Sequence, residues 1–168
     1  MDVPIEKSVA LSVKYLSVTD RYFTRRYIKR DGDNDTCLLY HSNKICLVTL
    51  AKSHAIFKKD VKILRVNFKV GDKLDRSSNK VVGKGKRGGQ HVDENSVLCF
   101  VECDDGSVYN IMAGIKGKLV EVNEHLMNDP KLLQMKAETD GYIAVLLQKL
   151  GGESDLSNSV SREEYEKL

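Results

Sequence analysis

Hydrophobic residues in the middle of this chain recur at alternate positions over short runs, which is the spacing of half-buried β-strands. The run VKILRVNFKV, residues 61–70, alternates apolar with basic or polar residues except at Leu64. Two further stretches predict hairpins: residues 37–50, where HSNK interrupts two apolar runs, and residues 97–112, where residues 104–106 (DDG) do so. The pattern therefore predicts antiparallel strands joined by short turns.

The later part of the chain continues the strand pattern around one short helix. GKLVEVNE, residues 117–124, predicts a strand, and Asn123 is expected to cap a helix that Pro130 ends. GYIAVLLQK, residues 141–149, is apolar on both faces, which predicts a strand with neighbours on both sides. Short strands without βαβ alternation favour a mainly β domain, built as a compact barrel or sandwich.

An aromatic and basic segment precedes these strands. DRYFTRRYIKR, residues 20–30, predicts a short helix capped by Asp20, because Phe23 and Tyr27 lie four residues apart on one helical side. The mixture of rings and cations has two interpretations. The rings can stack on bases or on a protein partner, or they can dock the segment onto the domain.

The composition divides the chain into one domain with two tails. Its 168 residues fit a flexible N-terminal tail (1–19), a β domain (20–150) and a polar C-terminal tail (151–168). The sequence from Ser161 to Glu164 is a capping box that can start a short terminal helix, although so short a helix can also fray.

Charge and cysteine content narrow the function classes. The formal net charge of +3 and pI near 8.6 are mild for a dedicated nucleic-acid binder. No stretch approaches the ~20 apolar residues of a membrane span. The spacing of the four cysteines contains no CxxC pair, so we expect free thiols in a reducing compartment and no zinc site. They are Cys37, Cys46, Cys99 and Cys103.

A glycine-rich basic loop is the most distinctive local feature. Residues 83–88, GKGKRG, match the G-x-G-x-x-G dinucleotide pattern, but the following GQHVDENS cannot form the helix that would hold a pyrophosphate. We expect a polar loop over residues 73–90 around a short strand at residues 80–82. The loop is either solvated or a binding surface. Its cations are Lys80, Lys84, Lys86 and Arg87.

Catalytic patterns are missing from the sequence. The four histidines are scattered without an HExxH spacing, and no GxSxG elbow occurs. We therefore expect no catalytic residues, no cofactor-binding residues and no metal site.

Residues 117–124, Pro130-Lys131-Leu132 and Gly141-Tyr142 resemble the closing half of a glycine-cleavage H-protein. This resemblance implies a lipoyl/biotinyl-carrier-like barrel-sandwich hybrid with short helices. In such carriers the modified lysine lies at the tip of an exposed hairpin. The matching tip here is Asp104-Asp105-Gly106, which has no lysine, so we expect neither an enzyme nor a carrier.

A second resemblance covers about residues 20–150. DRYFTRRY, HSNKICLVTLAKSH, NKVVGKGKRGGQ, LVEVNE and GYIAVLLQK are similar to the signature blocks of the Abitram (actin-binding transcription modulator) family. The resemblance implies binding of actin monomers and filaments, location in the nucleus at speckles and in the cytoplasm with its actin-rich projections, and a role in transcription and filopodial dynamics.

The residues of the actin contact are a physical inference, because the resemblance assigns none. Actin is acidic, so we expect it to contact Lys84, Lys86 and Arg87 together with Lys80 of the same loop, with Arg25 and Arg26 second. A lipoyl or biotinyl carrier and a nucleic-acid-binding module of nuclear bodies remain the alternatives.

Overall fold

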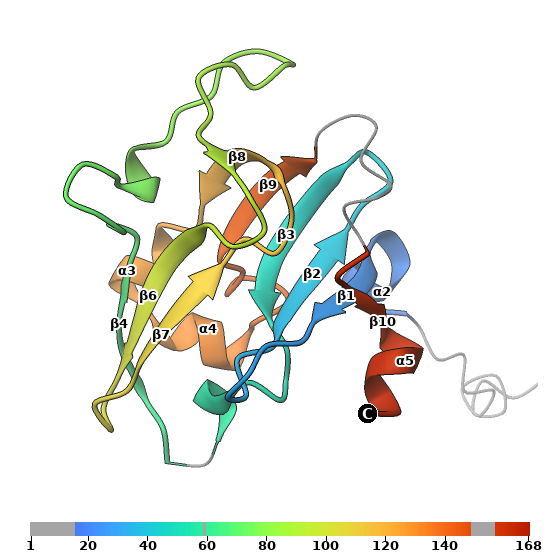
Figure 1. Cartoon of the computed structure of the whole chain (residues 1–168), viewed down its shortest axis with the longest axis vertical. Helices are drawn as coiled ribbons and strands as arrows, with labels where there is room; N and C mark the ends of the chain where they lie inside the picture. Colours follow the sequence, from blue (N-terminus) through green and yellow to red (C-terminus); the bar gives the residue numbers. More distant parts are fainter. Residues whose placement is uncertain (1–15, 59, 149–156) are drawn as a thin grey trace, which may run out of the picture.

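The computed structural model, which describes residues 16–58, 60–148 and 157–168, contains two antiparallel β-sheets (Figure 1). Within these residues the larger sheet has seven strands and the smaller has three. The larger comprises, in spatial order, β10 (Val160–Ser161), β1 (Thr24–Ile28), β2 (Thr36–Tyr40), β3 (Ile45–Leu50), β9 (Ala144–Gln148), β8 (Gly117–Val122) and β5 (His91–Val92). The smaller comprises β4 (Ile63–Asn67), β6 (Val97–Cys103) and β7 (Val108–Met112).

Short helices lie between the strands and at the two ends of the described chain. None in the described part of the chain is long and apolar enough to cross a membrane. They are α2 (Val18–Tyr22), α3 (His125–Asn128), α4 (Lys131–Met135), α5 (Arg162–Glu166) and the 3-10 turns η1 (Ala55–Phe57) and η2 (Arg76–Ser78).

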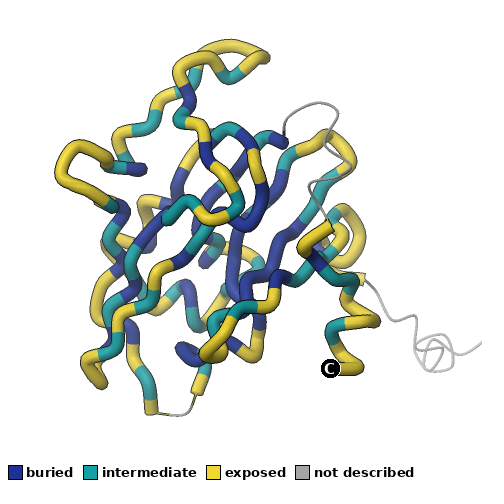
Figure 2. Tube along the Cα trace, in the orientation of Figure 1, coloured by how far each residue is buried: buried dark blue, intermediate teal, exposed yellow. Residues whose placement is uncertain are grey.

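One hydrophobic core lies between the two sheets. Leu38 of β2, Leu98 of β6 and Leu146 of β9 are completely buried members of it. Buried positions follow the facing strands in Figure 2, whereas the exposed ones gather in the turns and loops. Burial of these apolar side chains, worth about 25 cal/mol per Å² removed from water, holds the sheets together.

The architecture confirms the predicted fold class. The chain is mostly β with short helices, and its two sheets form a sandwich that does not close into a barrel. Both predicted hairpins are present, as β2–β3 and β6–β7. Strand β9 lies between β3 and β8, as its two apolar faces indicated.

The helix predicted from Asp20 is wrong for most of its length. Helix α2 ends at Tyr22, and residues 24–28 form β1 instead. Ser17 is the actual N-cap, because its hydroxyl accepts a hydrogen bond from the backbone N–H of Asp20. Strand β1 pairs with β2 on one side and β10 on the other, and these non-local hydrogen bonds outweigh the local helical pairs.

Two smaller predictions also fail. Asn123 does not cap a helix: Glu124 precedes α3, and the amide of Asn123 donates to the carbonyls of Asp140 and Tyr142. Pro130 does end α3, but it also begins α4. The strand predicted at residues 80–82 is reduced to one isolated bridge.

The last described segment packs against the larger sheet. The predicted capping box is present. The Ser161 hydroxyl accepts a hydrogen bond from the Glu164 backbone N–H, and the Glu164 carboxylate accepts one from the Ser161 backbone N–H. The ring of Tyr165 stacks on Tyr27 with centroids 4.2 Å apart, and its hydroxyl donates to Asp35 at 2.7 Å. Two segments lie outside the described residues. They are residues 1–15, in the expected N-terminal tail, and residues 149–156, which span the expected start of the C-terminal tail.

Candidate binding surface

The glycine-rich basic loop forms a small hairpin that projects from the body of the molecule, at the top of Figure 1. We call residues 80–89 the basic hairpin. Val82 and Arg87 exchange two backbone hydrogen bonds of 2.9 and 3.0 Å. Gly83 begins the tip with φ of +73°, a left-handed conformation that favours glycine. The cations of the tip therefore lie on a turn closed by Val82 and Arg87, and not at the start of a helix.

Side-chain hydrogen bonds clamp the base of the basic hairpin to β8. The amide of Asn79 donates to the Leu119 carbonyl at 2.9 Å and its oxygen accepts from the Gln90 backbone at 2.7 Å. The buried Arg76 donates to the Gln90 side chain at 2.9 Å. A Cβ on Gly89 would lie 2.8 Å from the Leu119 carbonyl oxygen, so glycine permits this close approach. The base is thus fixed although the tip is exposed.

Lysines from separate parts of the chain meet in a groove of about 540 Å³ beside the basic hairpin. We call it the lysine groove. Its apolar lining includes the buried Val92 and the half-buried Leu147. The cations come from the turn between β2 and β3, from the basic hairpin, from the residue before β8 and from the second residue of β8. These are Lys44, Lys84, Lys116 and Lys118.

The groove keeps most of its positive charge uncompensated. Lys118 donates to the Gly85 carbonyl at 3.0 Å, which ties the basic hairpin to β8 without neutralising the ammonium group. The ammonium of Lys116 lies 4.0 Å from a carboxylate oxygen of Asp93. Lys44 and Lys84 have no ion pair among the described residues. Like charges gathered at one place attract anionic groups of a partner.

The turn that carries Lys44 is preformed. Lys44 adopts φ of +72°, and its carbonyl accepts a hydrogen bond from the Gln148 backbone at 3.0 Å. Its own N–H donates to the His41 carbonyl, and the Asn43 side chain accepts from the backbone of Ile45. The position of this lysine backbone is therefore set by the fold before any partner binds.

The structure distributes the predicted contact residues over two regions. Lys84 lines the lysine groove, whereas Lys80, Lys86 and Arg87 lie on the same basic hairpin outside its lining. Arg25 and Arg26 belong to β1, which β2 and β3 separate from β9. Sequence reasoning missed three groove lysines, because only strand register brings these distant positions together. They are Lys44, Lys116 and Lys118.

Both β1 arginines are engaged inside the fold. The guanidinium of Arg25 donates to both carboxylate oxygens of Glu138 at 2.8 and 2.7 Å. These hydrogen bonds hold the pKa of Glu138 below its usual range. Arg26 donates to the hydroxyl and carbonyl of Ser159, at 3.0 and 2.9 Å. The two side chains therefore connect β1 to the chain before β9 and to the segment before β10.

Replacement of Arg25 tests this structural role. We expect Arg25→Met to lower the free energy of unfolding by about 1–2 kcal/mol, because Glu138 loses a bidentate partner in a half-buried position. Urea denaturation followed by circular dichroism measures the change. Lys29→Met, an exposed cation without an ion pair among the described residues, is the control. Equal stability of the two variants would contradict the role.

The aromatic rings of residues 20–30 differ in their surroundings. Tyr27 stacks on Tyr165, and Phe23 meets His41 edge to face at 5.5 Å. Tyr22 is 55% exposed. Two of the three rings therefore pack against other residues of the domain, which favours the docking interpretation of this segment.

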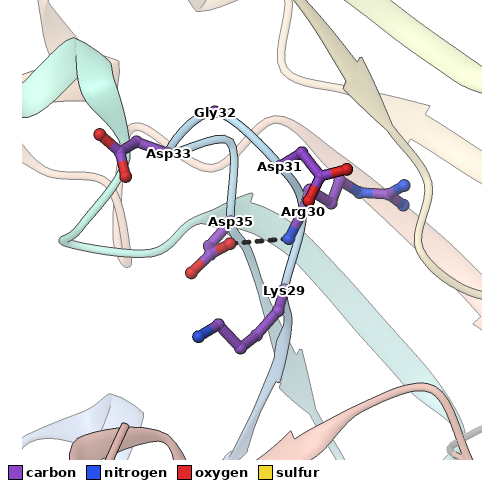
Figure 3. Close-up of a pocket in the computed structure, with 6 residues that line it drawn as sticks. All are labelled: Lys29, Arg30, Asp31, Gly32, Asp33 and Asp35. Carbon is purple, nitrogen blue, oxygen red and sulfur yellow. Dashed lines mark hydrogen bonds between the residues drawn. The ribbon is translucent and has the colours of Figure 1, made fainter.

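A second cavity, of about 610 Å³, lies at the turn between β1 and β2 (Figure 3). Two of its carboxylates are used by the fold. Asp35 accepts from the Arg30 backbone at 2.8 Å and from Tyr165, and Asp33 pairs with Lys58 at 2.8 Å. Figure 3 shows the Arg30 guanidinium and the Asp33 carboxylate pointing to opposite sides of the turn. These groups do not converge on one ligand position.

The turn between β6 and β7 does not fit a lipoyl or biotinyl group. Its tip is Asp104-Asp105-Gly106, and Gly106 has φ of +83°. Asp104 exchanges hydrogen bonds with the backbone of Lys62 through its N–H and its carboxylate. An amide-linked prosthetic group needs a lysine amine at the tip, and this tip has two carboxylates instead.

The cysteines and histidines offer no alternative centre. All four thiols are buried, and desolvation raises the pKa of each of them, to about 12 for Cys37. Buried thiols of this kind are poor nucleophiles. Among the described residues, no three His, Cys, Asp or Glu side chains gather as a metal site.

Comparison with known proteins defines the class of this fold. Residues 74–168 match the family model of the glycine cleavage H-protein. A glycine cleavage system H protein from Mycobacterium marinum superposes with a TM-score of 0.58 and 15% identity, covering 84% of this chain and 94% of that one. The chain therefore has an H-protein-like fold.

Sequence relatives then identify the family. Protein Abitram of Danio rerio is 45% identical over 90% of this chain and 88% of its own length. The Homo sapiens protein of that name is 38% identical, with coverage of 90% and 86%. The Drosophila melanogaster protein is 42% identical, with coverage of 90% and 70%. The chain belongs to the Abitram family.

Proposed function

We propose that this chain is a non-enzymatic regulatory module that binds actin through the basic hairpin and the adjoining lysine groove. The observation that supports this proposal is the gathering of cations from separate segments at one end of the larger sheet. Actin is acidic, so charge complementarity favours the encounter. The family resemblance supplies the expectation of actin as the partner.

The fold supports a binding role over a carrier role. The hairpin that carries the prosthetic group in lipoyl carriers ends here in carboxylates, and the cations lie on other segments. In Figure 1 the basic hairpin is at the top and the β6–β7 turn is at the lower left. Binding through charge requires cations that are exposed and held in position. The exposed tip and the fixed base of the basic hairpin supply both.

Charge reversal in the basic hairpin tests the proposal. We expect Lys84→Glu/Lys86→Glu/Arg87→Glu to weaken co-sedimentation with actin filaments at least tenfold at low salt, and less at high salt, because salt screens surface charge. The control is Lys29→Glu/Lys62→Glu/Lys131→Glu, which makes the same charge change at exposed positions outside the lysine groove. Unchanged binding by the first variant would remove the basic hairpin from the actin contact.

The proposed cellular setting follows from the same resemblance. We propose that the protein acts in the nucleus, at speckles, and in actin-rich projections of the cytoplasm, modulating transcription and filopodial dynamics. Imaging of a fluorescent fusion beside a speckle marker and labelled filaments tests this. A uniform distribution that does not follow either marker would contradict it.

A further inference from the structure

The lysine groove combines two properties that select its ligand. Among the described residues, positive charge comes from four ammonium groups, against one carboxylate, that of Asp93. Apolar lining comes from the half-buried Leu147 and from Val92, which is 3% exposed, beside the backbone of Gly117. A Cβ on Gly117 would lie 2.5 Å from the Leu147 carbonyl oxygen, so this part of the lining must stay without a side chain. The groove thus combines a strongly positive lining with some apolar surface.

We propose that the lysine groove takes a linear acidic segment of a partner protein, with one apolar side chain seated between carboxylates. The inference deepens the proposed function and rests on it for the identity of actin as partner. The apolar side chain packs on Leu147, next to Val92, and the carboxylates on either side reach Lys44 and Lys84. Such a segment matches both the charge and the apolar lining.

The composition of the groove favours a peptide over a nucleic acid. Among the described residues its lining contains no Phe, Tyr or Trp and no Arg, which are the side chains that stack best on bases or grip phosphates in a fork, and its one ring is the imidazole of His91. Lysine ammonium groups are point charges that accept carboxylates in many directions. Each exposed lysine–carboxylate pair contributes little alone, so the apolar side chain must supply part of the affinity.

Fluorescence anisotropy tests the proposal with a labelled nonapeptide of four glutamates on either side of one leucine. We expect binding by the full chain that weakens with salt. We expect Lys44→Glu/Lys116→Glu to weaken it at least tenfold, whereas Lys29→Glu/Lys62→Glu, with the same charge change outside the groove, leaves it within twofold. Thermal melting of each variant shows that the fold is kept.

A second peptide separates charge from apolar contact without altering the protein. We expect replacement of its leucine by serine to weaken binding at least threefold at equal charge. Equal binding of the two peptides would overturn the proposal, as would tighter binding of polyuridylate or of phosphatidylserine vesicles than of the leucine peptide.

Failure of this inference is distinguishable from failure of the proposed function. If the peptide binds as expected but filaments do not co-sediment, the groove does bind an acidic segment and actin is the wrong partner. If filaments co-sediment equally well with Lys44→Glu/Lys116→Glu, actin binds elsewhere and the groove is not its contact.

Discussion

Gly141→Ala is expected to lower the free energy of unfolding by about 3 kcal/mol or more, one of the two largest effects that we predict for this chain. A Cβ at Gly141 would lie 2.0 Å from the carbonyl oxygen of Leu132 and 2.8 Å from that of Lys136. Both atoms belong to the backbone, so no side-chain rotation relieves the overlap. Helix α4 would have to move, and with it the completely buried Leu133.

A second glycine in the same chain provides the control. Gly85 has no atom within 4 Å of an added Cβ, and its φ is not left-handed. We expect Gly85→Ala to raise the free energy of unfolding by about 0.5 kcal/mol, because alanine restricts the unfolded chain more than glycine does. Urea denaturation followed by tyrosine fluorescence and circular dichroism gives both values. Equal midpoints for the two variants would show that α4 tolerates displacement.

Local sequence signals predicted the elements that depend on local structure. The β6–β7 hairpin was predictable because strand alternation on both sides meets a turn whose glycine adopts positive φ. The capping box at Ser161 was predictable because its two hydrogen bonds join residues three positions apart. In each case the interactions that form the element lie within a few residues of one another.

Predictions failed where distant segments decide the conformation. Residues 24–28 were expected to be helical, but partners from β2 and β10 hydrogen-bond both edges of this strand. Asn123 was expected to cap a helix, but its amide bridges to Asp140 and Tyr142, about twenty residues later in the chain. Pairing over such separations leaves no mark in the local pattern.

The residues of the candidate binding surface also fall into those that the sequence could predict and those that it could not. Lys84 was predictable because four cations stand together in one glycine-rich loop. Lys44, Lys116 and Lys118 were not, because they join Lys84 only through the β2–β3 turn and the register of β8. The apolar lining was also hidden, since Val92 and Leu147 come from different strands.

The second large predicted effect is a loss of stability in mild acid that is caused by His54. Its side chain is 1% exposed, its Nδ1 accepts from the Ile56 backbone at 3.2 Å, and its Nε2 has no hydrogen-bond partner among the described residues. Tyr109 covers the ring edge to face at 5.1 Å. Desolvation lowers the pKa of His54 to about 4, although the carboxylates of Asp35 and Asp33 oppose the shift.

The sign of this shift makes the fold sensitive to mild acid. Below about pH 6.5, where an unfolded histidine gains a proton, the unfolded chain binds a proton that the folded chain excludes. The free energy of unfolding therefore falls as the pH drops from 7 towards 4, by about 3 kcal/mol in total, and this contribution levels off below pH 4. Urea titrations at half-unit pH intervals measure the fall.

His54→Asn separates this histidine from other acid effects. An asparagine oxygen can still accept from the Ile56 backbone at this N-cap, but it has no group that gains a proton. We expect the variant to be less stable at pH 7, because it loses the ring contact with Tyr109, and yet to change far less between pH 6.5 and 4.5. Carboxylates with lowered pKa values, such as Glu138, lose their stabilisation only as the pH falls further, since their contribution is present above the unfolded pKa near 4. An undiminished slope in His54→Asn above pH 4.5 would mean that the buried imidazole is not the group responsible.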